Sequence, residues 1–395
     1  MTTSTGTTAT QAAAERRGLL TAFAAFGTFW GAWSATLPDI REQAGLTDGE
    51  LGLALSAVAV AAVPAMPLAG RLIDRHGARR LLPPALLLFA AACVLPALAG
   101  SLLPLALALL ALGASTGGLD VFLNATTATW ERLEGRRLMA GAHGCFSLGV
   151  LVAGIGAGVA RDLGAGPRSI LGTSLVVIAV AAATQPAYRD AEPAPAQGAT
   201  SSAGRPRLAP VLLVLGLLIA GSFLVEDAVQ SWTALHLERS LGAPPWVGGL
   251  GVGLFAGAMA LGRFGVQWLA RPGSDALVVG GGGTALTLGV LLLALAPTAP
   301  LALVGAGVAG LGVSVLAPTM FSAVGARSAP GRAGAELALV TTLGYVGFVA
   351  GPPLIGLLSA ATTLPTALAL LAVLTAAVAV VGPLVLRRPA VPRLG

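Results

Sequence analysis

Residues 70–80 read Gly70-Arg71-Leu72-Ile73-Asp74-Arg75-His76-Gly77-Ala78-Arg79-Arg80, and a long apolar run lies on each side of them. Two apolar runs separate this basic stretch from each neighbouring arginine cluster, and the same spacing continues through Arg16/Arg17, Arg132/Arg136/Arg137, Arg189/Arg205/Arg207, Arg271, Arg327/Arg332 and Arg387/Arg388/Arg393. The connections between those clusters hold only Arg41, Arg161, Arg168 and Arg239. This alternation is the positive-inside pattern of a protein that crosses a membrane many times, with both ends in the cytoplasm.

The composition excludes a water-facing surface. Hydrophobic residues make up 55% of the chain and charged residues 10%, whereas soluble domains carry roughly 25% charged residues. The net charge of +6 does not indicate a nucleic-acid partner, because the arginines lie in short loops without a basic patch of interleaved aromatic residues. Cys93 and Cys145 lie inside apolar runs, without the spacing of a disulfide or metal site. We therefore expect no nucleic-acid partner, cofactor or metal.

Twelve apolar runs are long enough to cross a bilayer, which takes about 20 residues per helix. They cover 18–38, 49–70, 80–100, 103–129, 138–160, 168–186, 210–235, 247–269, 276–296, 300–322, 335–358 and 364–386. The sequence thus predicts an all-α membrane protein with six-helix bundles at 18–186 and 210–386. A cytoplasmic linker at 187–209 joins them, and a disordered tail at 1–17 and a tail at 387–395 are both cytoplasmic.

The two bundles are expected to be repeats. Trp33-Ser34-Ala35-Thr36-Leu37 matches Trp232-Thr233-Ala234-Leu235, and Gly70-Arg71, Gly135-Arg136 and Leu148-Gly149 match Gly262-Arg263, Gly331-Arg332 and Leu343-Gly344 in the same order. Two parallel repeats with a site near the midplane are a transporter architecture. Gly305-x-Gly307-x-x-Gly310 fits a dinucleotide fingerprint, but no strand precedes it, so we interpret it as a helix-packing surface.

The basic loop at 70–80 resembles the signature loop of the major facilitator superfamily, and it lies where that family has it, between the second and third crossings. The resemblance implies the major facilitator fold, with twelve transmembrane helices in two pseudo-symmetric bundles. It also implies a gating latch, in which Asp74 faces positive helix ends and arginines of the other half in one conformation only. The latch comprises Gly70, Asp74, Arg75, Gly77, Arg79 and Arg80, and Glu336 caps its own helix or pairs with Arg332 or this loop.

A second resemblance extends over most of the chain. It rests on 27–41 with 45–52, on Gly117-Gly-Leu-Asp120-Val-Phe-Leu-Asn124, on His143-Gly-Cys-Phe-Ser147-Leu-Gly149 and on Gly344-Tyr345-Val-Gly347 with Gly351-Pro352-Pro353. These stretches are similar to a bacterial group of major facilitators related to the fucose:proton symporters. In those symporters an acid of the fourth helix takes part in proton coupling. They also carry an acid in the first helix, which this sequence lacks between Gly18 and Pro38.

Asp120 is the first candidate for proton coupling, because an acid within a bilayer usually faces the bundle interior, a partner or water. The arginines are expected at helix ends, so Asp120 has no obvious guanidinium partner. Asn124 lies four residues further on and shares its helix face, where it can contact substrate. His143 can relay a proton with Asp120, or it can be a hydrogen-bonding packing residue. Asp120 can likewise be a structural acid.

Glu226 and Asp227 form a second acidic point midway along the seventh predicted helix. Adjacent residues point about 100° apart on a helix, so one of them is expected to face the cavity and the other a neighbouring helix. We place Glu226 with proton coupling and Asp227 with substrate binding. The other substrate-contact candidates are Gln230, Trp30, Trp33 and Trp232, and for the tryptophans lipid contact is the alternative.

The sequence predicts a secondary active transporter that works by alternating access in the bacterial inner membrane. Proton-coupled symport of a small neutral polar solute such as a sugar is the favoured activity, and proton-coupled efflux of a hydrophobic compound is the alternative. A non-transporting sensor would need a soluble output domain, and an intramembrane enzyme would need a nucleophile–base pair. We expect the lipid bilayer, the solute and protons as partners of a monomer.

Overall fold

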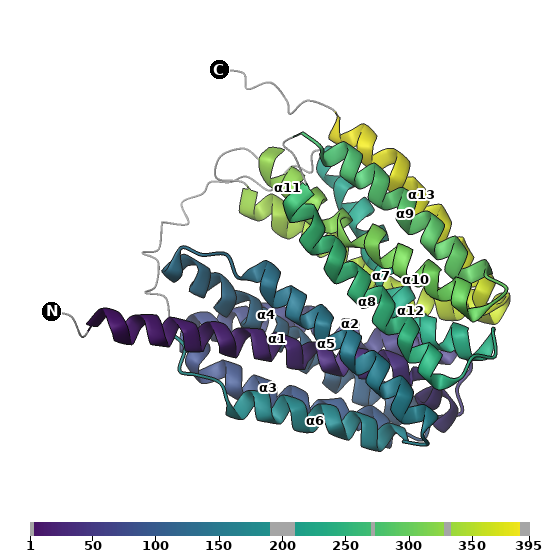
Figure 1. The fold of residues 1–395 in the computed structure, drawn as a ribbon, viewed down its shortest axis with the longest axis horizontal. Coiled ribbons are helices and arrows are strands. Elements are labelled where there is room, and N and C mark those ends of the chain that lie inside the picture. The colour runs from purple at the N-terminus through teal and green to yellow at the C-terminus, as the bar shows by residue number, and fades with distance from the viewer. Residues whose placement is uncertain (1–3, 190–209, 270–272, 328–332, 388–395) are drawn as a thin grey trace. The chain divides into compact units, whose positions relative to one another are not determined.

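The computed structural model describes residues 4–189, 210–269, 273–327 and 333–387, and within these ranges every regular element is a helix. In chain order the first elements are α1 (Ser4–Gln43), α2 (Asp48–His76), α3 (Ala78–Val94), η1 (Leu95–Leu98), α4 (Leu102–Glu134), α5 (Met139–Asp162) and α6 (Pro167–Ala183) (Figure 1). They are followed by α7 (Pro210–Arg239), α8 (Pro245–Leu269), α9 (Asp275–Leu295), α10 (Ala299–Ser314), α11 (Leu316–Arg327), α12 (Ala333–Ala361) and α13 (Leu364–Leu386).

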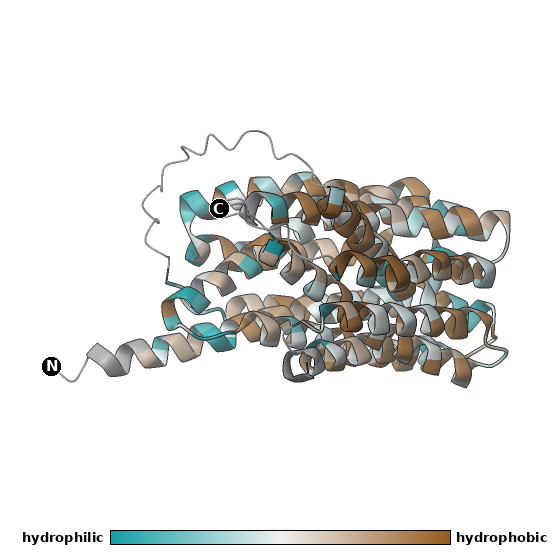
Figure 2. Ribbon diagram, turned by 90° about the horizontal axis from the view of Figure 1, so that it is seen from above, coloured by the Kyte–Doolittle hydropathy of each residue, from teal (hydrophilic) through white to brown (hydrophobic). Residues whose placement is uncertain are grey.

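Twelve membrane crossings account for these helices, which confirms the predicted fold class. Ten segments are long and apolar enough to span a bilayer, and in Figure 2 the apolar residues cover the middles of the helices. The short α6 and the less apolar α1 supply the other two crossings. Two crossings are interrupted, because the third passes from α3 into η1 at Leu95 and the tenth passes from α10 into α11 at Val315.

The expected disordered tail at 1–17 is wrong for the residues from Ser4 onward, because α1 begins there and runs without a break into the first crossing. Its early turns are held by the rest of the bundle. The Nε1 of Trp130 in α4 donates a hydrogen bond of 3.1 Å to the Ala12 carbonyl, and Glu15 is 1% exposed. Tertiary partners can keep a segment helical without a strongly apolar composition.

The chain divides into two compact units, Met1–Pro195 with Pro244–Gly253, and Ala196–Ala243 with Leu254–Gly395. In the first unit α1 packs along α5 and against α6, while α2 packs along α4 and α3 packs against α6. Small residues permit the close approach of α1 and α5. A Cβ placed on Gly149 would lie 2.2 Å from the Ala24 carbonyl oxygen, and one on Gly27 would lie 2.0 Å from that of Phe146.

Three of these pairings recur in the second unit. Its α7 packs along α12 and against α13, as α1 does with α5 and α6, and its α9 packs along α13, as α3 does with α6; α9 also packs along α10. Gly344, the predicted counterpart of Gly149, lies in the equivalent contact, where a Cβ would come 2.9 Å from the Ile219 side chain. A Cβ on Gly305 would lie 2.3 Å from the Leu293 backbone nitrogen. The fingerprint-like glycines therefore include helix-packing positions, as the sequence predicts.

Several predicted features lie wholly or partly outside the described residues. They are most of the linker 187–209, with Arg205 and Arg207, the turn residues Arg271, Gly331 and Arg332, and the tail beyond Arg387.

Candidate functional site

Asp120, Asn124 and His143 form a hydrogen-bonded chain between α4 and α5. The Asn124 Nδ2 donates to Asp120 Oδ1 at 3.0 Å and to the Asp120 carbonyl at 2.9 Å. The His143 Nε2 lies 3.1 Å from Asn124 Oδ1. Because an amide oxygen only accepts, this contact requires a proton on His143 Nε2, which both the neutral Nε2–H tautomer and the imidazolium carry. The structure confirms the shared face of Asp120 and Asn124, and it links His143 to Asp120 through Asn124.

Helix α1 supplies an aromatic neighbour of His143. The Phe23 ring meets the imidazole edge to face, with 5.1 Å between the ring centroids and 61° between the planes. Phe23 is 1% exposed, so it closes one side of the imidazole to water. The amide oxygen and the aromatic ring together restrict the orientation of the imidazole.

Two hydroxyl groups beside this chain were not among the candidates from the sequence. Thr116 precedes Asp120 by four residues on α4, and Ser147 follows His143 by four residues on α5. Both hydroxyl oxygens are buried and form no hydrogen bond within the described residues. Residues four apart on a helix are neighbours on one face, and this spacing from Asp120 and His143 is the sequence signal that could have identified them.

Glu226 is paired with an arginine inside the second unit. The Arg263 Nη2 of α8 lies 3.3 Å from Glu226 Oε1 of α7. The expectation that arginines lie only at helix ends is wrong here, because Arg263 is more than a turn inside α8, which ends at Leu269. The pair brings a positive and a negative charge together, so neither is left alone in the membrane-spanning region.

Asp227 faces a different helix from Glu226. A Cβ placed on Gly351 of α12 would lie 3.6 Å from Asp227 Oδ2, and Asp227 forms no ion pair or hydrogen bond with another described residue. The two adjacent acids thus have different neighbours, Arg263 of α8 for Glu226 and Gly351 of α12 for Asp227. This agrees with the angle of about 100° between successive helical residues.

The aromatic candidates differ in exposure. Trp33 is 2% exposed and stacks on Phe29, with 6.1 Å between the ring centroids and 17° between the planes. Trp232 is fully buried, and its Nε1 has no hydrogen-bond partner within the described residues. Neither ring is open to a ligand in this conformation, whereas Trp30 and Gln230 are partly exposed. Contact between any of the four and a substrate remains a prediction.

The predicted latch lies at the junction of α2 and α3. Gly77 separates the two helices with φ of 78°, and its N–H donates to the Ile73 carbonyl at 2.9 Å. This backbone conformation favours glycine. Asp74, Arg75, Arg79 and Arg80 are exposed, and Asp74 pairs with no other described residue. Glu336 lies in the first turn of α12 and is 8% exposed.

A further buried charge holds α5 to α1 at the opposite end of the first unit. Arg161 is 7% exposed. Its Nε donates to Asp39 Oδ2 at 2.7 Å, and its Nη1 donates to the Ala35 carbonyl at 2.7 Å. From the sequence alone, Arg161 was placed in one of the connections that contain few arginines. Both cysteines are free, and no cluster of three metal-ligating side chains occurs among the described residues.

Known proteins resemble the chain over nearly its whole length. An uncharacterised MFS-type transporter of Yersinia pestis is 30% identical over 370 residues, which are 91% of this chain and 92% of the relative. The membrane protein MosC of Rhizobium meliloti is 29% identical over 348 residues, 87% of this chain and 83% of MosC.

Solved structures share the fold at low sequence identity. The D-xylose-proton symporter matches with a TM-score of 0.74 and 13% identity, covering 95% of this chain and 98% of the symporter. The nucleoside transporter NupG matches with a TM-score of 0.73 and 12% identity, covering 95% and 99%. The family model of the Major Facilitator Superfamily matches residues 18–296. The chain therefore belongs to the major facilitator superfamily of membrane transporters.

Proposed function

We propose that this transporter is a proton-coupled symporter of a small neutral polar solute, such as a sugar, and that it works by alternating access. The observation that supports this most is the chain from His143 through Asn124 to Asp120. It places an acid and an imidazole, two groups that bind and release protons, in one connected path across two membrane-spanning helices. The relation to the fucose:proton symporters is part of the same proposal.

The solved relatives favour a neutral polar solute. One is named for symport of D-xylose with a proton and another for transport of nucleosides. Asn124 and Gln230 offer amide donors and acceptors, and Trp30 offers an aromatic face on which the apolar face of a sugar can stack. We further propose a monomer in the inner membrane with cytoplasmic termini, in agreement with the arginine pattern.

The test is solute-triggered proton uptake into proteoliposomes that contain a pH-sensitive dye. One panel holds neutral sugars and nucleosides, and a second panel holds hydrophobic cations. Wild-type protein is expected to respond to the first panel, and Asp120→Asn is expected to fall to the level of empty liposomes. Asp275→Asn is the matched control, because it makes the same change in the first turn of α9 and should respond like wild type.

Other outcomes would replace this proposal. A response to the cation panel alone would favour efflux of hydrophobic compounds. Equal responses of wild type and Asp120→Asn would remove Asp120 from coupling and direct attention to Glu226. The variant His143→Gln keeps an N–H group, so it should retain more coupled uptake than His143→Leu if the hydrogen bond to Asn124 matters.

A further inference from the structure

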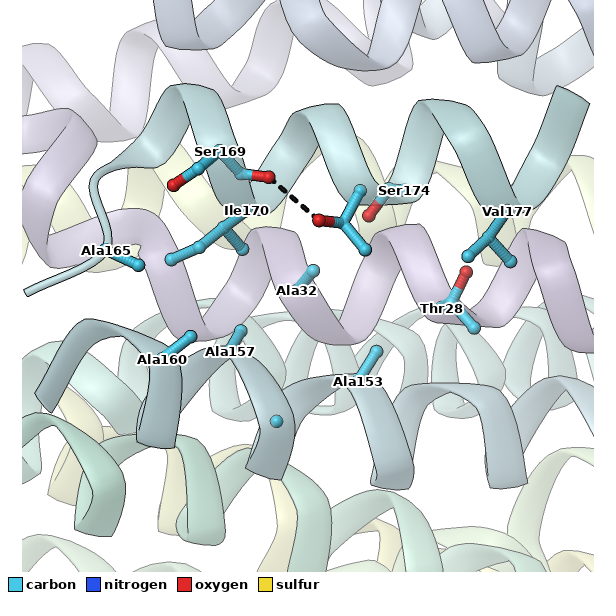
Figure 3. A pocket seen from close by; sticks show the side chains of 12 residues that line it. Thr28, Ala32, Ala153, Ala157, Ala160, Ala165, Ser169, Ile170, Ser174 and Val177 are labelled. Atoms are coloured by element: carbon cyan, nitrogen blue, oxygen red, sulfur yellow. Dashed lines mark hydrogen bonds between the residues drawn. The ribbon is translucent and has the colours of Figure 1, made fainter. Parts of the chain in front are cut away.

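A groove in the first unit lies outside the polar chain described above. Helix α1 forms its floor and helices α5 and α6 form its walls, as Figure 3 shows. Its volume is about 380 Å³, within the range of small-molecule sites. The lining includes Ala32 of α1, Ala153 and Ala157 of α5, and Ile170 and Val177 of α6.

Most hydroxyl groups that line the groove are already used within their own helices. The Thr28 hydroxyl donates to the Ala25 carbonyl at 2.7 Å, and the Thr173 hydroxyl donates to the Ser169 carbonyl at 2.9 Å. Ser174 differs. It is 4% exposed, lines the groove, and forms no hydrogen bond with another described residue. The groove is therefore apolar, with one unused donor.

Exposed apolar side chains lie one helical turn from lining residues of the groove, which makes its rims apolar. Val152 and Val159 of α5 and Val176 and Val180 of α6 all have exposed side chains, on helices that span the membrane. Lipid chains are the surrounding medium at this depth. An apolar groove with apolar exposed rims accepts an acyl chain from the bilayer without loss of polar solvation.

Two opposite charges lie where the walls end. Helix α5 ends at Asp162, and Arg168 lies in the first turn of α6. Both side chains are exposed, and neither forms an ion pair or hydrogen bond with another described residue. A negative and a positive side chain at one end of an apolar groove complement a headgroup that carries both an ammonium and a phosphate.

We propose that this groove binds one aminophospholipid molecule of the surrounding bilayer, of the phosphatidylethanolamine class. One acyl chain lies between α5 and α6, the phosphate contacts Arg168 and the ammonium contacts Asp162. Ser174 lies six residues after Arg168, about 9 Å along the helix axis at 1.5 Å per residue. At that depth its hydroxyl donates a hydrogen bond to an ester carbonyl of the lipid.

The experiment is native mass spectrometry of the purified full chain in mild detergent, with phosphatidylethanolamine or phosphatidylglycerol added. Gly156→Leu fills the groove, because a Cβ on Gly156 would meet no atom within 4 Å and the leucine enters open space. Gly172→Leu is its matched control, since Gly172 of α6 is equally open but does not line the groove. Arg168→Gln and Asp162→Asn test the headgroup contacts, and both are exposed positions that folding should tolerate.

Wild type and Gly172→Leu are expected to retain one tightly bound phosphatidylethanolamine, and Gly156→Leu is expected to lose it. Arg168→Gln should weaken binding of both lipids roughly fivefold, since one arginine near a membrane surface contributes about 1 kcal/mol. Asp162→Asn should weaken phosphatidylethanolamine alone. Equal lipid retention by wild type and Gly156→Leu would overturn the site. Equal affinity of wild type for the two lipids would overturn the choice of headgroup.

Discussion

At the scale of single residues, Arg161 is a buried charge that holds α5 to α1. It is nearly inaccessible to water, and its guanidinium satisfies Asp39 and the Ala35 carbonyl together. Arg161→Ala leaves a carboxylate and a carbonyl without this donor. Removing one partner of a buried pair costs about 3–5 kcal/mol, and the partial exposure of Asp39 reduces this to about 2–4 kcal/mol.

Thermal unfolding in detergent measures this loss. Arg41→Ala is the control, because Arg41 pairs with Asp48 at 2.8 Å but is more exposed, so its removal should cost about 0–1 kcal/mol. If both variants unfold at the same temperature, burial of Arg161 contributes no extra stability and the interpretation of this contact is wrong.

The contacts of the candidate residues could be predicted from the sequence where both partners lie within one turn of the same helix. Asn124 follows Asp120 by one helical turn, so their shared face and hydrogen bond follow from the helix repeat. The pairing of Arg263 with Glu226 was not predictable in this way. It joins residues 37 positions apart and depends on how α7 and α8 rotate about their axes, which a single sequence does not specify.

At the scale of elements, glycine decides how closely α1 and α5 pack. A Cβ on Gly149 would lie 2.2 Å from the Ala24 carbonyl oxygen, whereas a Cβ on Gly156 of the same helix would meet nothing within 4 Å. We expect Gly149→Ala to destabilise the first unit by about 1–3 kcal/mol through overpacking. Gly156→Ala should be neutral or stabilising by up to about 1 kcal/mol, because alanine favours helix.

The difference between these two alanine variants isolates the packing effect, since both changes occur inside α5. Unfolding temperature and yield of monodisperse protein are the measurements. If Gly149→Ala unfolds at the same temperature as Gly156→Ala, the two helices α1 and α5 make room for the added methyl group without loss of stability. The overpacking interpretation would then be wrong.

The length of each apolar run predicted the crossings, because bilayer thickness sets that length. It did not predict the breaks at Leu95 and Val315 or the start of α1 at Ser4. The start of α1 depends on tertiary partners, whereas both breaks lie beside a proline, which removes a backbone donor: Pro96 follows Leu95 directly, and Pro318 follows Val315 by three residues. The early turns of α1 have a Thr/Ala-rich composition typical of a tail, yet Ala12 and Glu15 are held by Trp130 and Arg189.

At the scale of the whole molecule, Arg189 ties together segments that are far apart in the chain. Its Nη2 donates to Glu15 of α1 and to Glu134 of α4, both at 2.6 Å, and its backbone N–H donates to Glu15 at 2.8 Å. These carboxylates raise the pKa of the Arg189 guanidinium. A raised pKa means that the stabilisation is fully present below the ordinary pKa of arginine, and therefore at neutral pH.

We expect Arg189→Gln to release the early turns of α1 while the membrane-spanning helices keep their structure. Amide hydrogen exchange in detergent micelles should become roughly tenfold faster over 9–17, because local opening there loses two ion pairs. Exchange within α4 and α5 should not change. Arg132→Gln is the control, because Arg132 is near the same end of α4 and bonds only the Thr129 hydroxyl in the described part of the chain.

Two other results would contradict this role of Arg189. Unchanged exchange over 9–17 in Arg189→Gln would mean that the hydrogen bond from Trp130 to Ala12 holds α1 without the ion pairs, and Trp130→Phe would then have to produce the release. Faster exchange throughout the first unit would instead make Arg189 a determinant of global stability. In that case the contact of Glu15 and Glu134 with the segment that follows α6 is part of the folded core of the unit.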